Sequence, residues 1–250
     1  MRSARAMKIQ KQNAIEPFFH AFVADFGGEV LSEAPMGHTA DYVFRKQLII
    51  GELKTLTADT TEDMNRKLAP KVHEWVRQNG RLPTGIAQGA KYVVNIRDMP
   101  REIQDFWLKI LKASVEGLVR DANRQIRDTK DRMGLPAARG VLFVGNQSNF
   151  YHDHPDSFRR LIAELLRKRT STGDLRYPHI NAVVYFSLGG VKSRDEGMAF
   201  WANLQMKHSP EEDVAPVVAF QGELQQAFYG YLEKVTGIVV RQHAQSGGQV

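Results

Sequence analysis

The stretch that decides the fold runs from residue 38 to residue 56 and reads HTADYVFRKQLIIGELKTL. Two apolar segments flank a polar turn centred between Lys46 and Gln47, a pattern that predicts a β-hairpin. An even-length loop at this centre pairs residues whose numbers sum to 93. This register places Asp41 directly opposite Glu52, with Cβ atoms about 5 Å apart on one face of the pair.

The second strand of this hairpin carries charges in an apolar setting. Lys54 stands two residues after Glu52, so both side chains project from the same face. Aliphatic residues occupy both faces of the strand, Ile49 and Leu53 on one and Ile50 and Leu56 on the other. Such a strand is buried, and charges in it must be paired or must bind a metal. Because Asp41 and Glu52 repel each other, the pattern favours a divalent cation between them, with Lys54 left to meet a substrate.

An aspartate separated by ten residues from Glu-Leu-Lys on a hairpin resembles the PD-(D/E)XK, or restriction-endonuclease-like, nuclease superfamily. The matching residues are Asp41, Glu52 and Lys54, and Thr39-Ala40 stands where a proline usually precedes the aspartate. The resemblance covers residues from about 14 to 146. It implies an α/β fold with an α-β-β-β-α-β core, a mixed central sheet flanked by helices, a helical insertion and a C-terminal α/β extension.

The resemblance also implies a reaction, the metal-assisted hydrolysis of phosphodiester bonds by an Mg²⁺-dependent endodeoxyribonuclease. Asp41, Glu52 and the backbone carbonyl of Leu53 would bind Mg²⁺, for which Mn²⁺ can substitute. Lys54 would orient the attacking water or stabilise the transition state. Two alternatives stay open. One is an inactive nucleic-acid-binding protein with the same fold, and the other is a structural or interaction protein in which the three charged residues form a buried ion network.

Two further candidate site residues lie in predicted helices. Glu16 stands near the regular start of an amphipathic helix within residues 8–27, and a first-helix glutamate often joins the metal site in this superfamily. The alternative is that Glu16 only stabilises the helix N-terminus. Gln125 lies at the edge of the apolar stripe of a long helix over 101–133, where a polar side chain needs a partner. The resemblance makes it a catalytic residue facing the site, and the alternative is an ordinary exposed glutamine.

Length and composition narrow the class of protein. The 250 residues fit a single nuclease-like domain, with residues 58–100 as an insertion between core elements. The chain has no cysteine, which excludes disulfides and cysteine-ligated zinc. It contains no apolar run of about 18 residues, and its basic N-terminus lacks the apolar core of a secretory signal. No contact with a membrane is therefore expected, and the expected location is the cytoplasm.

The charge balance points to the kind of partner. A net charge of +6 and a pI near 9.5 suit a polyanion, and the expected partner is nucleic acid, in the first place DNA. RNA remains open, as does exonucleolytic cleavage. Many members of the superfamily act as dimers, so a homodimer is also possible here.

The remaining periodic segments predict further elements of the core and its extension. A short edge strand is expected within 29–34, buried strands over 140–145 and 180–186, and helices ending near residue 78 and over 155–169 and 220–235. Residues 191–213 are charged and predicted to be irregular, and residues 241–250 to be a disordered tail.

Overall fold

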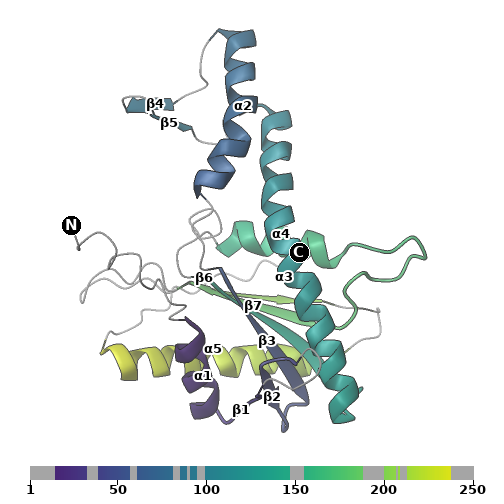
Figure 1. Ribbon diagram of the computed structural model, residues 1–250. Helices are drawn as coiled ribbons and strands as arrows, with labels where there is room; N and C mark the ends of the chain where they lie inside the picture. The colour runs from purple at the N-terminus through teal and green to yellow at the C-terminus, as the bar shows by residue number, and fades with distance from the viewer. Residues whose placement is uncertain are drawn as a thin grey trace, which may run out of the picture.

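The computed structural model describes residues 15–32, 39–56, 61–80, 85–88, 91–94, 99–146, 155–187, 200–206, 208 and 213–237. These residues form an α/β fold around one six-stranded sheet, with the strand order β1-β2-β3-β6-β7-β8 (Figure 1). The strands are β1 (Glu29–Val30), β2 (Tyr42–Phe44), β3 (Ile49–Leu56), β6 (Arg139–Asn146), β7 (Ala182–Ser187) and β8 (Phe200–Gln205). The expected tail over 241–250 lies outside the described residues.

The sheet is mixed, as predicted. β3, β6 and β7 run parallel to one another, whereas β1, β2 and β8 each pair antiparallel with their neighbours. In the hairpin of β2 and β3, Tyr42 pairs with Gly51 and Phe44 with Ile49. Both pairs of numbers sum to 93, so the predicted register is confirmed.

Two pairs of helices cover the two faces of the sheet (Figure 1). α1 (Ile15–Asp25) and α5 (Ala215–Thr236) pack on one face, and α3 (Arg101–Met133) and α4 (Pro155–Leu166) on the other. β3 contributes to both cores, because Ile49 and Leu53 face α1 and α5 while Ile50 and Leu56 face α3 and α4. The prediction of a central strand buried on both faces is therefore confirmed.

β3 is longer than its neighbour β2, and this mismatch creates the setting of the site. The pairing of β2 ends with Tyr42 and Gly51, whereas β3 continues to Leu56 in register with β6. Along this last part β3 has a ladder neighbour on only one side among the described residues. α1 begins at the same end of the sheet, since a Cβ added to Gly145 of β6 would lie 2.6 Å from a methyl group of Ile15.

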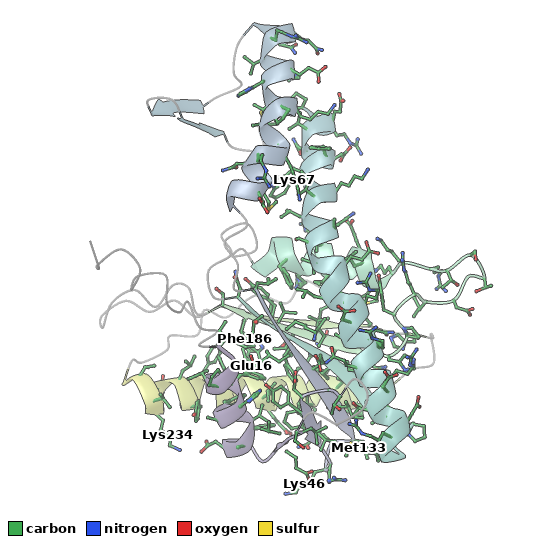
Figure 2. The ribbon with its side chains drawn as sticks, viewed as in Figure 1. Glu16, Lys46, Lys67, Met133, Phe186 and Lys234 are labelled. Atoms are coloured by element: carbon green, nitrogen blue, oxygen red, sulfur yellow. The ribbon has the colours of Figure 1, made fainter. Side chains whose placement is uncertain are left out.

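The predicted insertion contains α2 (Thr61–Asn79) and the strands β4 (Gly85–Gln88) and β5 (Lys91–Val94). β4 and β5 form a separate two-stranded sheet, which the sequence analysis did not predict. α2 lies beside the N-terminal half of α3, and together they form an arm that projects away from the large sheet (Figures 1 and 2, with Lys67 on α2). Within the part of the chain that the structure describes, no helix has both the length and the apolar composition needed to cross a bilayer.

The expectation that residues 191–213 are irregular is wrong, because they contain the edge strand β8. The alternation of apolar and polar residues in this strand is weak, because some of its half-buried positions hold polar residues. These form hydrogen bonds with the neighbouring helix. Asn203 donates to Gln225 of α5 at 3.1 Å, and Gln205 donates to Gln221 at 2.6 Å. Half-buried amides of this kind do not produce the apolar alternation by which a strand is recognised.

Candidate functional site

The two hairpin carboxylates meet at the end of β2. Asp41 immediately precedes this strand, and the observed register carries it opposite Glu52. Its Oδ2 accepts a hydrogen bond from the backbone N–H of Leu53 at 2.7 Å. The Asp41 side chain therefore satisfies a donor of β3 that no strand of the ladder reaches on this side.

The backbone carbonyl group of Leu53 lies on the same side of β3 as Asp41. In a β-strand, the N–H and the C=O of one residue point to the same neighbour. Because the Leu53 N–H bonds Asp41, its carbonyl oxygen also points to the Asp41 side of β3. The structure thus brings together the three oxygen-bearing groups predicted to bind a metal, namely those of Asp41, Glu52 and Leu53.

Lys54 joins the carboxylate pair to α3. Its Nζ donates to Glu52 Oε1 at 2.5 Å and to Gln125 Oε1 at 2.7 Å. The Gln125 Nε2 in turn donates to the Thr39 carbonyl oxygen at 3.1 Å. An ammonium group has three donors, so these two bonds leave one for a ligand. Gln125 was expected to face the site, and its side chain lies there, in contact with Lys54.

α3 also holds the chain that leads into Asp41. Thr129 Oγ1 accepts a hydrogen bond from the Ala40 N–H at 2.8 Å, and Arg132 donates to Thr39 Oγ1 at 2.7 Å. With Gln125, these residues are spaced at i, i+4 and i+7, so they share one face of the helix. Thr129 and Arg132 were not among the residues predicted from the sequence. A signal was present at Thr129, a hydroxyl in the buried stripe of an amphipathic helix, which must find a partner.

The electrostatics of the pair disfavour two negative charges in the absence of a cation. Glu52 is 1% exposed, and this burial, together with the charge of Asp41, raises the pKa of Glu52 to about 8. Burial also raises the pKa of Asp41, although the hydrogen bond from Leu53 and the charge of Lys54 act in the opposite direction. The ion pair with Lys54 favours a charged Glu52, but it does not offset the desolvation of the carboxyl group.

Glu52 also has an oxygen without a hydrogen-bond partner among the described residues, Oε2. An unsatisfied buried acceptor costs about 1–3 kcal/mol, and more if it is charged. Carboxylate and carbonyl oxygens are the ligands that Mg²⁺ prefers, and Mg²⁺ retains several waters beside one or two carboxylates. The donor set of Asp41, Glu52 and the Leu53 carbonyl therefore fits a divalent cation.

Glu16 lies near this set without completing it. It occupies the first turn of α1, where it is exposed, and its charge is close enough to raise the pKa of Asp41 (Figure 2). Across the described ranges, no group of three or more His, Cys, Asp or Glu side chains comes together closely enough to hold a metal ion. The structure therefore does not bring Glu16 together with Asp41 and Glu52 as a third carboxylate ligand.

No protein-family model, curated protein or solved structure matches this chain.

Proposed function

We propose that this protein is a metal-dependent nuclease of the PD-(D/E)XK, or restriction-endonuclease-like, type, which hydrolyses phosphodiester bonds in DNA. The observation that carries the proposal is that Asp41 lies next to Glu52, just beyond the last paired residues of the hairpin, with Lys54 on the same face as Glu52. When the insertion with α2, β4 and β5 is left out, the elements follow one another along the chain as α1-β1-β2-β3-α3-β6. This order supports the α-β-β-β-α-β core that the resemblance implies.

Each residue has a role that its contacts support. Asp41, Glu52 and the Leu53 carbonyl hold Mg²⁺ or Mn²⁺, which when bound supplies an acidified water and neutralises charge on the phosphate. The remaining donor of Lys54 orients the attacking water or binds a phosphate oxygen on which negative charge builds in the transition state. Gln125 keeps the Lys54 ammonium in place through its bond at 2.7 Å.

The charge of the chain supports a polyanionic substrate. At +6 it favours encounter with nucleic acid, and the proposed setting is DNA restriction, defence or repair in the cytoplasm. We propose endonucleolytic cleavage, by either a monomer or a homodimer, as the activity to test first.

One observation favours the alternative that this is a structural or interaction protein in which the three charged residues form a buried ion network. Lys54 joins Glu52 and Gln125 in one hydrogen-bonded chain, so the buried Glu52 is already paired with a cationic side chain. If this chain were only structural, Mg²⁺ would change neither the thermal stability nor any activity. An inactive nucleic-acid-binding protein would instead bind DNA without Mg²⁺ and would not cleave it.

Incubation with circular and linear DNA, in Mg²⁺ and in EDTA, tests the proposal. We expect the wild type to cleave in Mg²⁺ only, and Glu52→Gln and Lys54→Ala to lose at least about 100-fold of this activity. Lys46→Ala is the matched control, because Lys46 is an exposed lysine at the tip of the same hairpin (Figure 2). Undiminished cleavage by both site variants would end the assignment.

A further inference from the structure

Three buried side-chain polar atoms lack a hydrogen-bond partner among the described residues, and all three lie around Asp41. They are Glu52 Oε2, the Tyr42 hydroxyl and His20 Nε2. Glu52 faces Asp41 across the hairpin, Tyr42 follows it in the chain, and His20 of α1 contacts Tyr42. Unsatisfied buried groups are rare in folded proteins, so three of them around one carboxylate point to a binding site.

Tyr42 is inaccessible to solvent, with an exposed fraction of 0%. Its ring packs against Phe19 and Phe143, with ring centroids 5.6 and 6.0 Å away. Burial raises the pKa of Tyr42, and the charges of Asp41, Glu16 and Glu52 raise it further. The hydroxyl therefore lies within the field of the site carboxylates, although the ring itself belongs to the core beneath α1.

His20 approaches the same place from α1. Its ring meets the Tyr42 ring edge-on at a centroid distance of 5.5 Å, and it lies close enough to Asp41 to interact with it electrostatically. A buried polar atom without a partner is costly, because it loses its hydrogen bonds to water and gains none in return. Two such costs in neighbouring side chains are hard to explain by packing alone.

The chemistry of the two atoms indicates which ligand they take. Direct ligation by His20 is not supported, because its side chain does not gather with Asp41 and Glu52 into a metal-holding group within the described residues. A water that is bound to a cation can only donate hydrogen bonds outward. A hydroxyl oxygen accepts such a bond, and so does Nε2 of an imidazole whose proton is on Nδ1.

We propose that Tyr42 and His20 are positioning residues that accept hydrogen bonds from water in the hydration shell of the cation site at Asp41 and Glu52. The inference rests on the proposed function, since it requires that cation. It gives the site two flanks, with Lys54 on the α3 side and the Tyr42–His20 pair on the α1 side. Partners beyond the first ligands typically change metal affinity by about 10- to 100-fold.

Calorimetric titration of the full chain with Mg²⁺ tests the inference, at one fixed pH and buffer for all variants because metal binding releases protons from the carboxyl groups. We expect Tyr42→Phe and His20→Phe each to weaken Mg²⁺ binding by at least about tenfold. In EDTA, Tyr42→Phe should unfold at no lower temperature than the wild type, because it removes an unsatisfied hydroxyl. Tyr177→Phe is the control, since the Tyr177 hydroxyl donates to Glu116 at 3.0 Å away from the site. This variant should lose thermal stability and keep the wild-type affinity.

The outcomes separate the two proposals. If the wild type binds no Mg²⁺, or if Asp41→Asn binds it equally well, the cation site fails and the inference fails with it. If Asp41→Asn abolishes binding while Tyr42→Phe and His20→Phe bind like the wild type, only the inference is overturned. Because the two variants alter different elements, misfolding of one leaves the other as a test.

Discussion

Gln125 Oε1 accepts a hydrogen bond from Lys54 Nζ at 2.7 Å, although the two residues are 71 positions apart in the chain. The Gln125 amide is itself anchored to the Thr39 carbonyl oxygen at 3.1 Å. The orientation of the Lys54 ammonium thus depends on where α3 lies over β3.

Replacement of Gln125 should therefore impair catalysis more than cation binding. We expect Gln125→Ala to lower kcat for DNA cleavage by about 10- to 100-fold, because a misplaced ammonium loses its alignment with the phosphate. The Mg²⁺ affinity should fall less than the rate, since Asp41 and Glu52 remain and Thr129 and Arg132 still hold residues 39 and 40. Gln104→Ala, which alters a glutamine at the other end of α3, is the control and should retain the wild-type rate. Equal rates for both variants would contradict the role of Gln125.

Addition of Mg²⁺ should stabilise the protein through the carboxylate pair. At a concentration about 100-fold above Kd, binding to the native state contributes about 2.7 kcal/mol, which raises the Tm of a chain of this size by about 5–10 °C. Asp41→Asn and Glu52→Gln should show no such shift in differential scanning fluorimetry. Glu116→Gln should keep it, because Glu116 pairs with Lys168 outside the site. A wild-type Tm that ignores Mg²⁺ would favour the buried ion network.

The buried Glu52 should make stability depend on pH in a known direction. Its pKa is about 8 in the folded state, against an ordinary value of 4.5. The folded state binds the proton more tightly, so this contribution is complete below about pH 4.5 and is lost as pH rises toward 8. In EDTA, the Tm of the wild type should thus fall relative to that of Glu52→Gln across this interval. Parallel curves for the two proteins would show that Glu52 titrates normally.

The hydrogen bonds by which α3 holds residues 39 and 40, which we call the clamp, can be tested at Thr129. Thr129→Val keeps the shape of the side chain but leaves the buried Ala40 N–H without its acceptor. We expect a loss of about 1–3 kcal/mol in the free energy of unfolding, and weaker Mg²⁺ binding because Asp41 is no longer held. Thr129→Ser, which retains the hydroxyl, should restore most of both. If valine is tolerated as well as serine, the clamp is not needed.

The hairpin part of the site was predictable because its determinants are local. Loop length and strand pattern set the register, and the register alone brings Asp41 to Glu52. Gln125 could be suggested because a polar side chain beside a buried stripe needs a partner. The strand β8 could not be predicted from the sequence. Its amide side chains form hydrogen bonds with α5, so the strand lacks the apolar alternation by which strands are recognised.

The clamp and the Tyr42–His20 pair depend on contacts between distant segments, which no local pattern contains. Tyr42 has the sequence signature of an ordinary core aromatic, and its ring does pack as one. Only the structure shows that its hydroxyl has no partner within the described residues. Thr129 could have been questioned as a buried hydroxyl, but its bond to Ala40 spans 89 positions.

The clamp of α3 on residues 39 and 40 also bears on the order of folding. The hairpin can form early, because its strands are adjacent and its loop is short. The bonds that hold the approach to Asp41 join positions 86 to 93 apart, so they form only after a long loop closes. During synthesis, a ribosome-bound fragment that ends before α3 would carry both carboxylates yet lack the assembled site. On the proposed function, such a nascent chain would complete the cation site only when α3 docks on residues 39 and 40.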